Sequence, residues 1–321
     1  MNLIKKVNFF GGLVIVIIIG SFFVEVLRES KKETTYQKES VFRLEQKEMN
    51  VAPEVYISSI LLKQGDVFLI KIKSESPLIE VNGSLNSQDL HFFSWEETKK
   101  EWIAIEGVSV KENPGIYNLS IDFPNNQVFK KELNISERKF PIESFLVSES
   151  LKKEGYTQQK IVEEIVQKER LILEKIFEVS TEKSYFDKSF IYPLKNITVT
   201  GAFGSIRKSG DSAIQHLGVD LKANTGTAVY AINNGVARFS QDSKINGKTL
   251  IIDHGYGIFS LYCHLNEFKV TEGEEVTKGQ IIGFSGNSGY SLAPHLHFAV
   301  KINKTSVDPL KFIELTQKEF R

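Results

Sequence analysis

The pattern of apolar and polar positions changes along the chain. Its first feature is an uncharged apolar run. It extends from Val7 to Val24 and follows Lys5 and Lys6. Continued through Leu27, the run is long enough to cross a hydrocarbon core of about 30 Å as a helix. It lacks the small-x-small site at which a signal peptide would be cleaved. We therefore expect residues 1–27 to form a short tip and an uncleaved membrane anchor, whose orientation the flanking charges leave open.

The next two stretches differ in composition and in the pattern of their apolar residues. Residues 28–50 are rich in Lys, Glu, Gln, Ser and Thr, which predicts a solvated tether. Residues 51–137 contain short apolar segments separated by Asn, Pro and Gly, and in Ile116–Phe123 the apolar side chains alternate strictly. This pattern predicts a small β-sandwich of immunoglobulin-like type. Its single histidine, His91, offers no catalytic set, so a spacer or docking role is favoured.

A helical period replaces the alternation in the predicted linker, residues 138–188. Thr157 suits the N-cap of its main helix, and Gly155 would end any earlier one. The expected apolar stripe consists of Ile161, Val162, Ile165, Val166, Ile172, Leu173, Ile176 and Phe177. So wide a stripe needs a partner surface, and we expect the helix to pack on a neighbouring domain. A coiled-coil dimer is the alternative, although the heptads are few.

The last predicted domain, residues 189–314, is rich in β-type segments and punctuated by glycine. The spacing of the segments fits an antiparallel sheet with hairpin connections. The predicted fold class is therefore mainly β: an N-terminal transmembrane helix, a small immunoglobulin-like β-sandwich, a linker helix and a C-terminal antiparallel β-sheet domain.

Composition narrows the chemistry. The 321 residues contain 40 Lys and Arg and 40 Asp and Glu, so the overall charge gives no indication of a nucleic-acid partner. Cys263 is the only cysteine, which excludes an internal disulfide and a cysteine-based zinc cluster. Histidine is also scarce, but five of the six histidines lie in the last domain. These five are the candidates for a single site.

Two of these histidines, His295 and His297, lie two residues apart in an apolar segment. On a strand they would project from the same face, which suits a metal ligand beside a proton-handling group. His216 and Asp220 also converge, whether their segment is helical or extended, and Gly218 between them leaves room for an ion. With one of the two C-terminal histidines they make a His, Asp, His set, the composition of a catalytic zinc site with a position left for water.

The segment around His264 adds a further candidate. Strict strand alternation would place Tyr262 and His264 on one face and Cys263 on the other. A Cys263/His264 nucleophile pair is therefore disfavoured, and the thiol is expected in the core. His254 lies beside glycines in a predicted turn, where a structural or rim role is favoured over ligation.

Three motifs in order carry a family resemblance: His-x-Gly-x-Asp at 216–220, Tyr-x-His-Leu at 262–265 and Pro-His-Leu-His-Phe at 294–298. Together with the segment 276–283 they resemble the lysostaphin/LytM-type zinc metallopeptidases, which cut peptide bonds in bacterial peptidoglycan. The resemblance covers about residues 190–312.

The resemblance assigns roles position by position. It makes His216, Asp220 and His297 the ligands of one Zn²⁺ ion, and His264 and His295 the pair that handles protons and the developing oxyanion. Tyr262 is expected to line the substrate groove.

The resulting functional prediction is a membrane-anchored zinc endopeptidase that acts on peptidoglycan stem or cross-link peptides. A non-catalytic activator or scaffold for another wall hydrolase is the alternative, although such relatives lack metal ligands and all five positions are filled here. A wall substrate implies a cytoplasmic amino terminus, a single span at residues 7–27 and an extracytoplasmic catalytic domain. A regulatory protein could bind the β-domain or the linker helix. The sequence leaves open the bond cleaved, any autoinhibition and the oligomeric state.

Overall fold

The computed structural model describes residues 32, 37–38, 51–124, 126–164, 168–178 and 181–320. The predicted anchor and almost all of the predicted tether lie outside these residues. None of the helices in the described ranges is long and apolar enough to cross a membrane. From residue 54 onward, apart from 74–77, the chain forms one compact unit.

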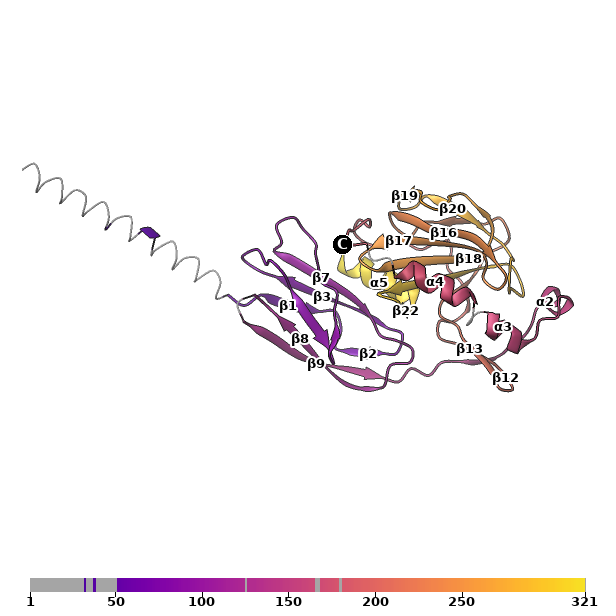
Figure 1. Ribbon diagram of the computed structural model, residues 1–321, viewed down its shortest axis with the longest axis horizontal. Coiled ribbons are helices and arrows are strands. Elements are labelled where there is room, and N and C mark those ends of the chain that lie inside the picture. Colours follow the sequence, from indigo (N-terminus) through magenta and orange to yellow (C-terminus); the bar gives the residue numbers. More distant parts are fainter. Residues whose placement is uncertain are drawn as a thin grey trace, which may run out of the picture. The chain divides into compact units, whose positions relative to one another are not determined.

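Two β-sheets form the first part of this unit (Figure 1). The first sheet has the order β1-β3-β7-β6, with β1 Glu54–Ile57, β3 Val67–Lys73, β7 Glu101–Gly107 and β6 Phe93–Ser94. The second has the order β2-β9-β8-β4-β5, with β2 Leu61–Lys63, β9 Val128–Ser136, β8 Gly115–Asp122, β4 Asn82–Leu85 and β5 Gln88–Asp89. The alternation predicted for β8 is confirmed, because Leu119 and Ile121 join side chains of both sheets in one apolar cluster. The immunoglobulin-like type stays a prediction.

A 10-stranded sheet dominates the C-terminal part, as the glycine-punctuated pattern predicted. Its main path is β11-β14-β21-β18-β17-β16-β19, with β11 Val199–Gly201, β14 Val219–Lys222, β21 His295–Ile302, β18 Ile258–Phe268, β17 Gly247–Gly255, β16 Gly235–Ser243 and β19 Glu275–Val276. The strands β15 Ala228–Tyr230, β20 Ile281–Ser285 and β22 Thr305–Val307 pair beside that path. A separate small sheet joins β10 Ile142–Ser144, β12 Ile206–Ser209 and β13 Ser212–Gln215. The helix α5, Pro309–Glu319, follows β22. At its N-cap, the Asp308 side chain accepts a hydrogen bond from the Leu310 amide.

Short helices make up the linker: α2 Glu149–Lys153, α3 Gln158–Glu164 and α4 Arg170–Phe177. Both predicted boundary residues are confirmed. The Thr157 hydroxyl accepts a hydrogen bond from the Lys160 amide at 3.2 Å, and Gly155 leaves the preceding helix with φ of 77°. Glycine is suited to this left-handed conformation because it has no side chain to collide with the backbone.

The linker helices pack on the large sheet, as their apolar stripe predicted. In α3, Ile161 joins a cluster with Ile245 and Tyr290. In α4, which lies along the sheet in Figure 1, Leu173 and Phe177 contact a cluster of apolar residues on β16, β17, β18 and β21. This cover explains why most of β17 and β18 is buried on both faces.

One part of the stripe prediction is wrong. Ile172 is 52% exposed, although the stripe placed it on the buried face. The described part of α3 runs to Glu164, and α4 begins at Arg170 after π-helical residues 168 and 169. Ile165 and Val166 of the predicted stripe lie outside the described residues. An inserted wider turn rotates the faces that follow it, so α4 buries Leu173, Ile176 and Phe177 instead.

The first β-sheet packs directly on the C-terminal part. Its Val67, Leu69 and Ile105 belong to the same apolar cluster as the interior of the large sheet. Phe93 stacks on Tyr256 with ring centroids 4.1 Å apart, and Lys311 donates to the Asp66 carboxylate at 2.5 Å. These contacts join the β-domain to the domain that carries the candidate site.

His254 has a structural position at the end of β17, as the sequence favoured. Its side chain is fully buried, with Nδ1 2.7 Å from the Asn234 carbonyl and Nε2 2.8 Å from the Ser260 hydroxyl. Burial lowers the pKa of His254 to about 4, because the charged imidazolium would lose its hydration. The unfolded chain, with a pKa of about 6.5, binds the proton more readily than the folded chain.

The stability of the protein should therefore fall on acidification from about pH 6.5 towards pH 4. Between about pH 7 and pH 5, His254 alone should lower the free energy of unfolding by about 2 kcal/mol. Urea unfolding with a chelator present would measure this for the wild type and for His254→Gln. Because the remaining histidines are the same in both proteins, the difference in slope isolates His254. Equal slopes would contradict the assignment.

Candidate metal centre

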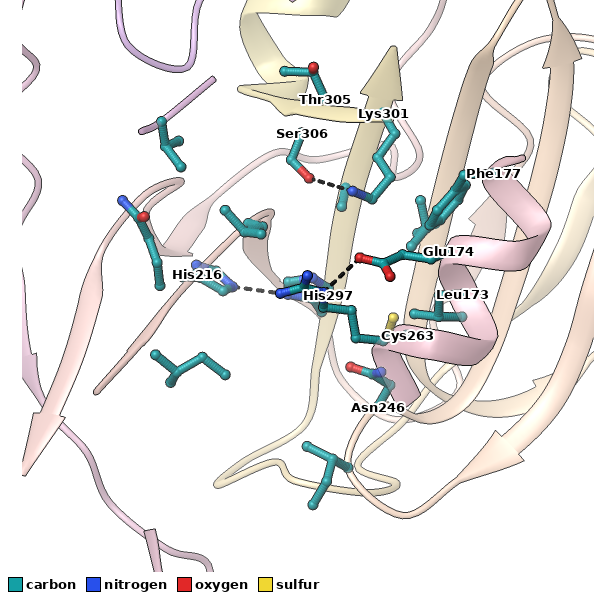
Figure 2. A pocket seen from close by; sticks show the side chains of 18 of the residues that line it. Leu173, Glu174, Phe177, His216, Asn246, Cys263, His297, Lys301, Thr305 and Ser306 are labelled. Carbon is teal, nitrogen blue, oxygen red and sulfur yellow. Dashed lines mark hydrogen bonds and ion pairs between the residues drawn. The ribbon is translucent and has the colours of Figure 1, made fainter. Parts of the chain in front are cut away.

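Three side chains converge where β14 meets β21. The antiparallel register places Asp220 directly opposite His297, and His216 lies just before β14. His216 Nε2 is 2.9 Å from Asp220 Oδ1 and 2.9 Å from His297 Nδ1, and His297 Nδ1 is also 2.9 Å from Asp220 Oδ1. The structure thus brings together the His, Asp, His set that the sequence singled out. Figure 2 shows two of its members, His216 and His297, pointing toward each other.

Backbone groups fix the ring of His216. Its Nδ1 lies 2.9 Å from the Ala202 carbonyl, which can only accept, so Nδ1 carries the proton and Nε2 presents a lone pair to the site. The absence of a side chain at Gly218 serves the His297 ring, whereas the predicted room for an ion stays a prediction. A Cβ atom there would come within 2.7 Å of the His297 ring, so the missing side chain makes room for this ligand.

The Asp220 carboxylate is the electrostatic centre of the set. Burial tends to raise its pKa, but the neighbouring imidazoles of His216, His295 and His297 outweigh that effect and hold the pKa well below its usual range. Its second oxygen, Oδ2, accepts a hydrogen bond from Arg207 Nη2 at 2.7 Å. Arg207 therefore orients the carboxylate and leaves Oδ1 directed at the two imidazoles.

The donor set fits zinc. Two imidazole nitrogens and one carboxylate oxygen all lie within 4.8 Å of one another, with their lone pairs converging. Such acceptors repel at 2.9 Å unless a proton or a cation lies between them. Three N and O ligands match the first shell of a catalytic zinc ion, which keeps its fourth position open. His216, Asp220 and His297 would hold the ion.

Two further histidines face this set. The ring centroid of His264 is 4.8 Å from that of His295 and 6.0 Å from that of His297. The Ser288 carbonyl accepts from His264 Nδ1 at 2.8 Å, so Nε2 of this ring is free to accept a proton. His295 Nδ1 lies 2.8 Å from the Ala293 carbonyl, and its Nε2 lies 3.5 Å from Asp220 Oδ1. The structure places both beside the candidate ligands, while their catalytic roles stay predictions.

Strict alternation fails within β18. His264 has φ of 59°, a left-handed conformation that interrupts the strand pattern, and β17 and β18 shift register beside it. His264 consequently lines the same cavity as Cys263 and Leu261. The prediction that Tyr262 shares its face and lines the groove is wrong. Tyr262 is fully buried, and its hydroxyl accepts from the Ile232 amide at 3.2 Å in the core.

The Cys263 thiol is buried, as predicted, and is not set up as a nucleophile. Burial raises its pKa to about 12, so the thiolate is scarce at neutral pH.

A cavity of 640 Å³ extends from the metal centre along the sheet. His216, His264 and His297 line it, and Lys301 and Ser306 line another part. Figure 2 shows Leu173, Glu174 and Phe177 of α4 on one side of this space. The linker helix therefore contributes a wall to the candidate substrate cleft.

Sequence reasoning missed Arg207 and Ser288. Arg207 lies on β12, in the segment between residues 205 and 215 whose length no motif fixed. Ser288 lies in a glycine-rich segment and contributes a backbone carbonyl, which every residue type possesses. No local pattern marks either residue, since both act through contacts between segments distant in sequence.

Comparison with known proteins agrees with this geometry. Residues 214–309 match peptidase family M23. Over 108 residues the chain is 39% identical to the DD-carboxypeptidase/endopeptidase Mpg of Neisseria meningitidis serogroup B, which covers 32% of this chain and 25% of that protein. The chain thus spans about a quarter of the length of the curated relative it matches.

Two solved structures extend the comparison. The catalytic domain of lysostaphin from Staphylococcus simulans is 34% identical and covers 37% of this chain and 93% of that domain, with a TM-score of 0.34. A Pseudomonas aeruginosa protein described as a peptidase M23 covers 78% of this chain and 93% of its own, at 21% identity and a TM-score of 0.52, which is a likeness of fold. From the family match over residues 214–309, the identity to Mpg and the converging His216, Asp220 and His297, we conclude that this part of the chain belongs to peptidase family M23, the family of the lysostaphin/LytM-type peptidases.

Proposed function

We propose that this protein is a zinc metalloendopeptidase that hydrolyses peptide bonds of bacterial peptidoglycan. The observation that carries the proposal is the convergence of His216, Asp220 and His297, with His264 and His295 beside them. The names of similar proteins support the substrate class, since they include a peptidoglycan DD-endopeptidase of Vibrio cholerae and a glycyl-glycine endopeptidase of Staphylococcus capitis.

A bound zinc ion would lower the pKa of a water ligand and polarise the scissile carbonyl. The chain's own residues supply the rest. Arg207 holds Asp220 in place, and Ala202 fixes the tautomer of His216, so the ligand atoms are arranged before metal binds. With its Nδ1 proton held by Ser288, His264 accepts the proton of the attacking water at Nε2. His295, on the same side of the site, donates to the oxygen on which negative charge develops.

The surroundings suit a peptide substrate. The cavity continues from the metal centre along the sheet, which provides space for residues on one side of the scissile bond. We propose that stem or cross-link peptides of peptidoglycan bind there. Such a substrate lies outside the cytoplasmic membrane, which supports a cytoplasmic amino terminus, a single membrane span at residues 7–27 and an extracytoplasmic catalytic domain. The two N-terminal sheets would form an immunoglobulin-like spacer between the anchor and the peptidase.

Removing a ligand and removing a proton-handling histidine should have different effects. His297→Ala should lose both zinc and muropeptide release, because one of three ligand atoms disappears. His264→Ala should keep stoichiometric zinc but lose turnover by about 100-fold or more, because the proton acceptor is gone. Zinc content by mass spectrometry and digestion of purified sacculi would measure the two effects. A wild-type protein without zinc would contradict the metal site. An active His264→Ala variant would contradict the role of His264 as the proton acceptor.

Arg207→Ala should weaken zinc binding by about 10- to 100-fold, the usual effect of removing a group that orients a ligand. Lys208→Ala is the matched control, because Lys208 is the exposed neighbour on the same strand and also loses one positive charge. Competition with a chromophoric chelator would give both affinities. If Arg207→Ala binds zinc as tightly as Lys208→Ala does, the ion pair does not orient Asp220.

Deleting residues 7–27 should move the protein from the membrane fraction to the soluble fraction, because the proposed apolar span is removed. In intact spheroplasts, added protease should degrade the catalytic domain of the full-length chain. Cell fractionation and immunoblotting would follow both. A full-length chain in the soluble fraction, or one protected from the protease, would contradict the proposed anchor or its orientation.

A further inference from the structure

A buried carboxylate from the linker enters the catalytic domain beside the candidate site. Glu169 lies between α3 and α4, outside the residues that match family M23, and is 6% exposed. It accepts four hydrogen bonds from the turn between β16 and β17. The donors are the Ile245 amide at 2.6 Å, the Asn246 amide at 3.0 Å, the Asn246 side-chain amide at 2.7 Å and the Ser243 hydroxyl at 3.1 Å.

This turn touches His264 directly. The Asn246 carbonyl accepts a hydrogen bond from the His264 amide at 3.0 Å. At this contact His264 has its left-handed φ of 59°, a conformation that is energetically costly for a residue other than glycine. A conformation of that cost persists only when neighbouring groups determine it. The Asn246 carbonyl is one of those groups.

A second connection leads to the side chain of His264. The Ile245 carbonyl accepts from the Tyr290 amide at 2.6 Å, in the segment that contains Ser288. The Ser288 carbonyl in turn accepts from His264 Nδ1 at 2.8 Å. Glu169 therefore binds the amides of Asn246 and Ile245. The Asn246 carbonyl supports the backbone of His264, and the Ile245 carbonyl supports the segment that fixes its imidazole.

The donors of the turn require this carboxylate. Ile245 is buried, and its amide points with three other donors at the Glu169 oxygens. A buried donor without an acceptor destabilises the fold, so the turn would rearrange to find other partners. Rearrangement would also move the Ile245 and Asn246 carbonyls, because the Glu169 carboxylate holds the amides of these same two residues.

We propose that Glu169 is a positioning residue for His264: by ordering the turn Ser243–Asn246, it sets the backbone conformation and the imidazole orientation of this histidine. The inference deepens the proposed function and rests on it where catalysis is measured. It also means that part of the catalytic arrangement is supplied by the linker, beyond the residues that define the family.

The full-length protein can test this with three variants. Glu169→Ala removes all four acceptor contacts, whereas Glu169→Gln keeps the shape and one oxygen acceptor. Glu163→Ala is the matched control, because Glu163 is an exposed glutamate of the neighbouring helix α3. Glu169→Ala should lower kcat on a soluble cross-linked muropeptide by about 100-fold, with KM within about twofold, since a displacement of about 1 Å can have this effect. Glu169→Gln should recover part of the loss, and Glu163→Ala should match the wild type.

A readout independent of activity separates this inference from the proposed function. Nitrogen-15 NMR of labelled imidazoles should show His264 with its proton on Nδ1 in the zinc-loaded wild type. In Glu169→Gln and Glu169→Ala that signal should shift or split between tautomers while zinc stoichiometry stays at the wild-type value. If the wild type cleaves no muropeptide, the proposed function fails, but the NMR comparison still tests the positioning.

Several outcomes would overturn the inference. Wild-type kcat together with an unchanged His264 signal in the Glu169 variants would show that the turn orders itself. Higher activity in Glu169→Ala would show that the contact only holds the linker helix against the cleft. A rise in KM with kcat unchanged would assign Glu169 to substrate access. If Glu169→Ala does not fold, the near-isosteric Glu169→Gln decides, and its wild-type kcat and spectrum would reject the proposal.

Discussion

The antiparallel pairing of β14 with β21 is the constraint on which the rest of the site depends. It places Asp220 opposite His297, and directly opposed residues have Cβ atoms about 4.5–5.5 Å apart, close enough for their side chains to share one ion. His216 completes the set from the segment before β14, with its ring held by Ala202. The backbone ladder thus fixes two ligands, and a single carbonyl fixes the tautomer of the third. Three hydrogen-bond acceptors thus lie close together in a buried place, and only a cation or shared protons can stabilise them there.

The proton-handling side of the site is held differently. His264 leaves the regular strand geometry, and its position depends on two carbonyls, Asn246 and Ser288, from segments on either side of it. These segments are in turn connected to the linker through Glu169. The metal centre is therefore built on the sheet itself, whereas the neighbouring histidine is supported by turns. Turns need additional contacts to be rigid, and the linker provides some of them.

Much of the fold was predictable, because periodicity reports burial. Alternation in β8 and the β-rich pattern after residue 189 led to the correct element types, and Thr157 and Gly155 marked helix boundaries correctly. The errors occurred where the period is broken locally. A bulge at His264 separated Tyr262 from the cleft, and a wider helical turn before α4 left Ile172 exposed. Neither break has a glycine or proline to announce it at that position.

The sequence by itself determined which side chains can bind metal, because histidine is scarce and His216, Asp220, His264, His295 and His297 occur in ordered motifs with strand spacing. The tertiary structure alone decided which faces those side chains occupy and what supports them. Arg207 meets Asp220 across 13 residues, and Glu169 meets Asn246 across 77. Contacts over such separations depend on how the strands and the linker pack, and the residues that make them are ordinary charged positions in the local pattern. For this reason the ligand set could be recognised in the chain, whereas the groups that orient it became visible only in the folded protein.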